Sequence, residues 1–180
     1  MENLTYNDFI KAHEDEEIDL VTFVTDYHLN LSPEDARKIS RQGYNCMGFA
    51  LNTFQWETIC SYQETYNDWY DDPIEERNIA CRDCVSEILS LSNLFWYPSI
   101  REVESERDLQ NGEYLVAFRT SEDDFHFMRR MPDGRWFEKC GNTIIRECTD
   151  KVFDDEWISI NGNITYDSDI HLFAVKEVAA

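Results

Sequence analysis

The chain has 180 residues, of which 16 are Lys or Arg and 37 are Asp or Glu, so its formal net charge is −21. This length is enough for one domain with a substantial core and short for two. The negative field repels nucleic-acid phosphates and anionic membrane surfaces, which argues against direct binding to either. An aromatic fraction of 14% argues against disorder. We therefore expect a single domain over residues 1–180, with a helical extension or cap at 1–42 and the core at 43–180.

Neither the N-terminus nor the cysteine content has the features of an exported protein. The chain starts Met-Glu-Asn-Leu-Thr-Tyr, without the basic start or apolar run of a signal peptide, and lacks any run of about eighteen apolar residues. We expect a cytoplasmic protein with no membrane contact and with its six cysteines reduced. Cys81 and Cys84 form a single CxxC pair without a second pair of ligands, so we predict no metal or other cofactor. A zinc-stabilised domain that uses this pair is a minor alternative.

Helical spacing of apolar residues dominates the first half of the chain. Two short helices are predicted within 6–28. A third helix begins at Ser32, because serine is a favoured N-cap and Pro33 suits the first helical position. Further helices are predicted over 46–62 and 73–91.

Strand patterns dominate the second half. The predicted strands cover residues 112–119, 125–130, 136–139, 143–146 and 170–176. The sequence Pro132-Asp133-Gly134-Arg135 is typical of a turn, and it joins two of these strands in a hairpin. The Asn and Gly residues at 161–163 indicate a loop. Helices followed by an antiparallel meander predict an α+β fold, with the N-terminal helices packed on a C-terminal sheet.

A cysteine and a histidine on different predicted elements suggest thiol chemistry. Cys46 starts the predicted helix over 46–62, where the positive end of the helix dipole should lower a thiol pKa that is normally about 8.5. His126, on the strand over 125–130, would hold the proton as an imidazolium and form an ion pair with the thiolate. A lone cysteine is more often a small core residue, and a lone strand histidine is usually structural. The Asn-Cys-x-Gly setting at a helix start favours the catalytic interpretation.

Strand parity suggests a third member of the site. His126 and Glu138 are twelve residues apart across the predicted hairpin, so their side chains should share one face of the sheet. The Glu138 carboxylate would then accept a hydrogen bond from the imidazole and favour its charged form. Backbone N–H groups around Cys46 would supply an oxyanion hole, with Asn45 or Tyr44 as an additional side-chain donor.

The segment Tyr44-Asn45-Cys46-Met47-Gly48-Phe49-Ala50 resembles the nucleophile motif of the NlpC/P60 branch of the papain-like cysteine hydrolases. The motif reads aromatic, Asp or Asn, Cys, variable, Gly, apolar, apolar. His126, with a polar residue twelve positions later, is similar to the second motif of that family. The return strand Trp136-Phe137-Glu138-Lys139-Cys140-Gly141 resembles an NlpC/P60-like subgroup in which Trp, a variable residue, His, Lys and then Gly occur.

This resemblance covers residues 43–62 and 112–146. It implies a papain-like fold in which Cys46 is the nucleophile, His126 the general base and acid, and Glu138 the orienting residue. Glu138 departs from the family, which usually has His, Asn or Gln at this position. The exported cell-wall enzymes of the family also carry signal peptides and wall-binding modules, which this sequence lacks.

The sequence thus predicts a cysteine peptidase or amidase that cleaves an amide through a thioester on Cys46, without a cofactor. The substrate class stays open between a peptide, an isopeptide, a peptidoglycan fragment and a protein side-chain amide. The alternative is a non-catalytic acidic interaction protein on the same fold, which uses its charge of −21 to bind a basic protein partner or to mimic DNA.

Overall fold

The computed structural model describes residues 44–53, 55–60, 74–121, 124–141, 145–148, 151–159 and 161–177. The proposed cap at 1–42, and with it the helices expected within 6–28 and after Ser32, lies outside the described residues. Within the described ranges no helix has both the length and the apolar character needed to cross a bilayer. The cytoplasmic location and the single domain over 1–180 stay predictions.

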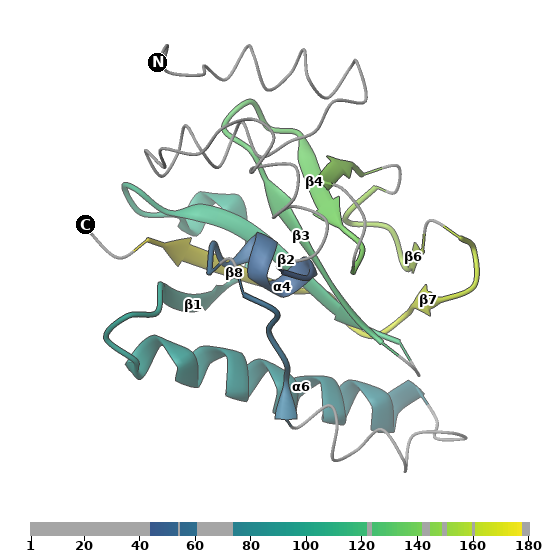
Figure 1. Ribbon diagram of the computed structural model, residues 1–180. Coiled ribbons are helices and arrows are strands. Elements are labelled where there is room, and N and C mark those ends of the chain that lie inside the picture. The colour runs from purple at the N-terminus through teal and green to yellow at the C-terminus, as the bar shows by residue number, and fades with distance from the viewer. Residues whose placement is uncertain are drawn as a thin grey trace.

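A six-stranded sheet organises the fold, with the strand order β1-β8-β2-β3-β4-β5 and antiparallel pairing throughout (Figure 1). Its strands are β1 Ser99–Val103, β2 Tyr114–Thr120, β3 Phe125–Arg130, β4 Trp136–Lys139, β5 Ile145–Glu147 and β8 His171–Lys176. A second, two-stranded sheet pairs β6 Trp157–Ile158 with β7 Thr165–Tyr166. The predicted meander corresponds to β2 through β5. The mixed α+β class is therefore confirmed.

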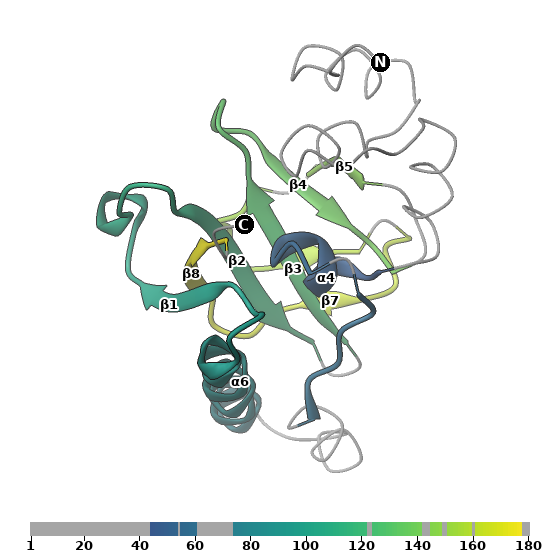
Figure 2. The same cartoon turned by 60° about the vertical axis from the view of Figure 1, so that its left-hand side comes forward.

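Helices cover one face of the large sheet. The helical elements are α4 Cys46–Ala50, α6 Ile74–Ser90, η1 Leu91–Asn93 and η2 Glu106–Asp108. Figures 1 and 2 both show α4 across β3 and α6 alongside β1 and β2, in agreement with their contacts. Phe127 of β3 packs in the core that α4 and α6 share, whereas Met128 packs with Trp157 and Tyr166 of the small sheet. Strand β3 is therefore buried from both sides.

Local turn chemistry explains the β3–β4 hairpin, whose strand bounds are those predicted. Gly134 has φ +91°, a value that glycine adopts without steric cost, and its N–H donates to the Met131 carbonyl at 2.9 Å. The Asp133 carboxylate accepts from the N–H of Arg135 at 3.0 Å. Both interactions use residues within the turn itself, which is why the sequence predicts this hairpin well.

The helix predicted over 46–62 is wrong in length, because α4 ends at Ala50. The chain reverses after Leu51 through Asn52, which has φ +60°, and the Thr53 N–H donates back to the Gly48 carbonyl at 3.1 Å. The following segment then crosses directly over Gly48. Two hydrogen bonds between the Asn45 side chain and the Glu57 backbone hold this crossing segment at the start of α4, and these tertiary contacts outweigh the helical spacing of its apolar residues.

Three strands were not predicted, namely β1, β6 and β7. Strand β1 pairs with β8, about seventy residues away along the chain, so no local pattern marks the pairing. Strands β6 and β7 have two residues each, too few for a visible alternation. The loop predicted at 161–163 lies between these two strands.

Candidate active site

Cys46 is the first residue of α4, and Asn45 is the N-cap of that helix. The Asn45 side-chain oxygen accepts from the Gly48 N–H at 3.1 Å, which fixes the first turn. Cys46 is 6% exposed, and its thiol donates to the Phe125 carbonyl at 3.8 Å. Among the described contacts, no hydrogen bond joins this thiol to His126.

The expected low pKa of Cys46 is wrong for this structure. Burial raises the pKa of the thiol well above its ordinary value, and the Asp124 carboxylate raises it further. Backbone N–H groups of Phe127 and Met47 act in the opposite direction but do not compensate. A helix of five residues gives the sulfur too little positive potential to offset its desolvation. A preformed thiolate–imidazolium pair therefore does not fit this environment.

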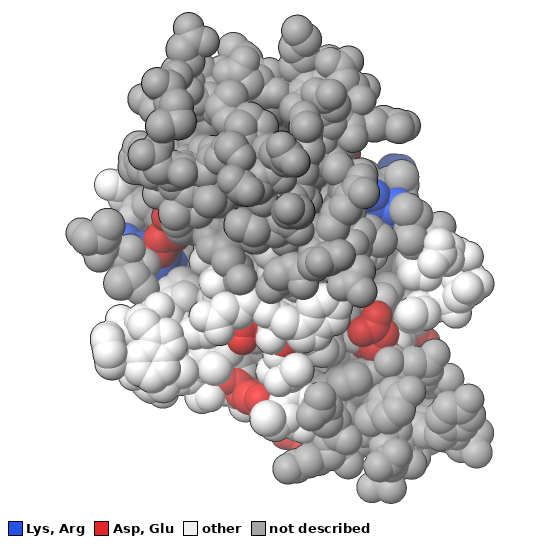
Figure 3. Space-filling model, viewed as in Figure 1, with Lys and Arg blue, Asp and Glu red and all other residues white. Residues whose placement is uncertain are grey.

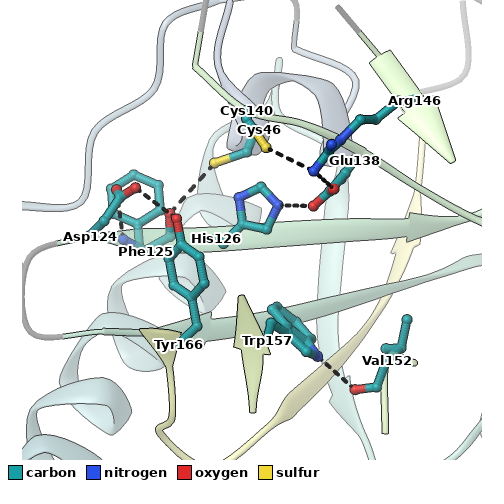
Figure 4. A network of polar contacts seen from close by, with 10 residues as sticks. All are labelled: Cys46, Asp124, Phe125, His126, Glu138, Cys140, Arg146, Val152, Trp157 and Tyr166. Carbon is teal, nitrogen blue, oxygen red and sulfur yellow. Dashed lines mark hydrogen bonds and ion pairs between the residues drawn. The ribbon is translucent and has the colours of Figure 1, made fainter. Parts of the chain in front are cut away.

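A buried chain of polar contacts joins three strands at His126. The imidazole Nε2 lies 2.6 Å from Glu138 Oε2, and Arg146 donates from Nη2 to Glu138 Oε1 at 2.5 Å (Figure 4). Glu138 is directly opposite Arg146 in the β4–β5 register and opposite Met128 in the β3–β4 register. His126 is two residues from Met128 and shares its face, so the predicted parity of His126 and Glu138 is confirmed.

The Glu138 carboxylate is ionised in this network. Burial alone would raise its pKa, but the hydrogen bond from His126 and the charges of His126 and Arg146 outweigh burial and lower the pKa below its usual 4.5. Because an ionised carboxylate only accepts hydrogen bonds, Nε2 of His126 carries the proton. Nδ1 is then the nitrogen that can accept a proton when the ring is neutral.

Aromatic rings hold the imidazole in place. The Tyr166 ring stacks on it at a centroid distance of 5.2 Å and an angle of 30°, and Trp157 meets it edge-on at 6.3 Å. The Tyr166 hydroxyl donates to Asp124 Oδ2 at 2.9 Å, so the stacking ring is itself anchored (Figure 4). With Glu138 on one side and Tyr166 across its face, His126 has little rotational freedom.

Cys46 and His126 open into one cleft of about 430 Å³. Its walls come from the segment after α4, the start of β3, the end of β4 and the loop between β6 and β7. The lining residues are Asn45, Cys46, Trp56, Glu57, Thr58, Asp124, Phe125, His126, Cys140, Gly141, Ser159, Asn161, Asn163, Ile164 and Tyr166. A bound molecule would therefore contact the thiol and the imidazole together.

Known proteins offer no match to this arrangement. No family model, no curated protein and no solved structure matches the chain. The NlpC/P60 relationship therefore stays a prediction, which rests on the residues around Cys46 and His126.

Of the two side chains predicted to donate to an oxyanion, Asn45 lines the cleft and Tyr44 does not. One N–H of the Asn45 side-chain amide donates to the Glu57 carbonyl at 2.6 Å, which engages one of its two donors. Tyr44 is fully buried and does not line the cleft. Its carbonyl accepts from the buried Lys139 ammonium at 2.5 Å, and Lys139 also donates to the Gly141 carbonyl. This lysine ties the start of α4 to the end of β4. A role for Tyr44 as an oxyanion donor does not fit its burial, whereas that of Asn45 stays a prediction.

Within the described ranges, His126, Glu138 and Cys140 form one cluster of potential metal ligands, with their ligand atoms within 4.8 Å of one another. Arg146 lies in the same cluster, bonded to Glu138 and 3.9 Å from Cys140 Sγ. A guanidinium beside two of three ligands opposes a second cation, so we assign the cluster to an ion-pair network. Cys81 and Cys84 of the alternative zinc site are buried in the helical core.

Sequence reasoning missed Arg146 and Tyr166. Arg146 was detectable, because it lies on a predicted strand that continues the hairpin and faces Glu138 in a simple antiparallel register. Tyr166 belongs to the two-residue strand β7 and reaches His126 only through tertiary packing. No local pattern marks it.

Proposed function

We propose that this protein is a papain-like cysteine hydrolase that cleaves an amide or peptide bond through a thioester on Cys46. The observation that carries the proposal is the imidazole of His126, oriented by Glu138 at 2.6 Å in the cleft that also contains Cys46. A nucleophile, a base and an orienting carboxylate on separate rigid elements are the arrangement that acyl transfer requires. The NlpC/P60-like motifs around Cys46 and His126 support the same class.

The raised pKa of Cys46 favours general-base catalysis over a preformed ion pair. Nδ1 of His126 removes the thiol proton as the sulfur attacks the substrate carbonyl carbon. The Glu138 carboxylate stabilises the imidazolium that forms. The imidazolium then protonates the leaving amine and leaves a thioester on Cys46. Water, deprotonated by the same nitrogen, releases the acid and restores the thiol.

Trapping of an acyl-enzyme tests the proposal. With p-nitrophenyl acetate we expect a burst of nitrophenolate and an acetyl group on Cys46, mapped by peptide mass spectrometry. His126→Ala should slow acetylation of Cys46 by about 10²-fold, because the general base is lost. Cys148→Ser is the matched control, since it removes a partly buried thiol that does not line the cleft.

Exposed Cys60 reacts with activated esters without any catalysis, so the wild type is compared with Cys60→Ser. Acetylation of Cys46 at a rate that His126→Ala leaves unchanged would contradict the proposal. In that case the alternative of an acidic interaction protein takes precedence. That function requires binding to a basic partner that survives Cys46→Ala and collapses with added salt.

A further inference from the structure

Two carboxylic acids line the cleft, while the nearby cations Arg146 and Lys139 do not line it and are bonded to Glu138 and to backbone carbonyls. Asp124 lies at the entry to β3, and Glu57 lies on the segment that follows α4. Among the described residues that line the cleft, none is Lys or Arg. In Figure 3, red carboxylates are spread over the described part of the face that is in view, and blue cations show only near its edges.

The Asp124 carboxylate is fixed in position but not neutralised. Oδ1 accepts from the Phe125 N–H at 2.8 Å, and Oδ2 accepts from the Tyr166 hydroxyl at 2.9 Å. Both donors are neutral. In the part of the chain that the structure describes, no ion pair involves Asp124 or Glu57. Among the described residues the Asp124 carboxylate therefore has no cationic partner, whereas the Glu57 carboxylate lies close to the Tyr97 hydroxyl, with its Oε1 buried.

Trp56 lines the same cleft and is 51% exposed. Indole faces attract ammonium and guanidinium groups more strongly than other aromatic rings do. Carboxylates and a half-exposed indole together form a surface suited to a cation.

Resting on the proposed hydrolase function, we infer that the substrate carries a positive charge, an ammonium or guanidinium group, next to the amide that is cleaved. The cationic group lies beside Asp124, while the scissile carbonyl lies at Cys46. A peptide with Lys or Arg adjacent to the scissile bond has this chemistry. The overall charge of −21 adds long-range attraction for such a peptide.

This charge arrangement also bears on how the nucleophile is activated. Asp124 opposes formation of a thiolate at Cys46 in the empty cleft. A substrate cation beside Asp124 offsets that negative potential at the moment when the thiol loses its proton. The reactive form of the sulfur would then be favoured only with the correct substrate bound.

Matched alkylating probes test the inference without the need for turnover. The probes are the N-chloroacetyl derivatives of lysine amide, arginine amide, Nε-acetyl-lysine amide and glutamate amide, which share one reactive group. The chloroacetyl carbon forms a bond to Cys46 Sγ, chloride leaves, and the thiol proton passes to His126 or to water. The second-order rate of labelling at Cys46 is followed by peptide mass spectrometry at low and at raised salt.

We expect the lysine and arginine probes to label Cys46 about tenfold faster than the neutral acetyl-lysine probe, and the glutamate probe to be slowest. Added salt should narrow these differences. Asp124→Asn should reduce the preference for cations while it retains the hydrogen bond to Tyr166. The control Asp154→Asn removes one charge from an exposed position away from the cleft and should leave the preference unchanged.

Two outcomes separate this inference from the proposed function. Equal labelling of Cys46 by all four probes, still dependent on His126, would overturn the cationic substrate and leave the hydrolase intact. Labelling of Cys46 that is slow for every probe and independent of His126 would overturn both. A preference for cations that persists in Asp124→Asn but vanishes in Glu57→Gln would assign recognition to Glu57 instead and overturn the role given to Asp124.

Discussion

Replacing Glu138 by glutamine is expected to lower kcat/KM by about 10³-fold, because the amide cannot stabilise the imidazolium of His126. We expect the loss of activity to come from the contact between Glu138 and His126, because both carboxylate oxygens of Glu138 are held in place. Glu138 Oε2 is 2.6 Å from Nε2 of His126, and Arg146 fixes the other oxygen. A glutamine nitrogen placed toward His126 would also force the proton onto Nδ1, the nitrogen that has to accept it from Cys46. The measurement is steady-state kinetics on the best substrate from the probe series.

The same variant is expected to lose stability at neutral pH but not in acid. The folded-state pKa of Glu138 lies below its unfolded value of 4.5, so the carboxylate stabilises the fold above that pH. This contribution disappears as the pH falls through the folded-state pKa. Urea unfolding of wild type and Glu138→Gln should therefore differ by about 2 kcal/mol at pH 7 and converge in acid.

Glu104→Gln is the matched control, since Glu104 is exposed and lies beyond the end of β1. It should match the wild type in both measurements. Full activity in a folded Glu138→Gln protein would contradict the orienting role of Glu138. It would leave Arg146 and Glu138 as a structural ion pair beneath His126.

Gly48→Ala is expected to destabilise the protein by about 3 kcal/mol, the largest effect that we foresee for a single methyl group. A Cβ at this position would overlap the carbonyl oxygen of Gln55 and press on Cβ of Tyr44 at 3.0 Å. The first neighbour is a backbone atom and the second is bonded directly to the backbone, so neither can move without displacing the main chain. The segment over Gly48 would have to move, together with Glu57, which Asn45 holds through two hydrogen bonds.

Thermal unfolding followed by circular dichroism measures this effect, and Gly162→Ala is the control. Gly162 has φ +68° but no atom within 4 Å of an added Cβ, so only the backbone cost of about 1 kcal/mol applies. Equal losses of stability in the two variants would mean that the segment after α4 does not pack over Gly48 as described.

Elements held together by short-range interactions could be predicted from the sequence. The bounds of β3 and β4 follow from a turn in which Gly134 and Asp133 form hydrogen bonds with nearby residues of the same turn. Strand alternation likewise predicts that His126 and Glu138 share one face of the sheet. The helix over 46–62 failed for the opposite reason, since its apolar spacing is that of a helix but the crossing over Gly48 depends on tertiary packing.

The candidate site also combines features that the sequence predicts with features that depend on the folded chain. Cys46, His126 and Glu138 were chosen from motif spacing, and the structure brings the latter two into contact. The electrostatics of the sulfur could not be predicted, because burial and the approach of Asp124 are properties of the folded chain. A helix N-terminus is favourable for a thiolate only where the desolvation cost is smaller than the attraction.

The order of strands in the large sheet has a consequence for biosynthesis. Strand β8, the last described along the chain, is inserted between β1 and β2 and pairs with both. Until β8 has left the ribosome, β1 lacks the strand with which it pairs in the described part of the sheet, and β2 has one unpaired side. Such open edges attract other chains. We therefore expect the sheet to complete only after residues 171–176 have emerged, with chains stalled before residue 171 more dependent on chaperones than chains that include β8.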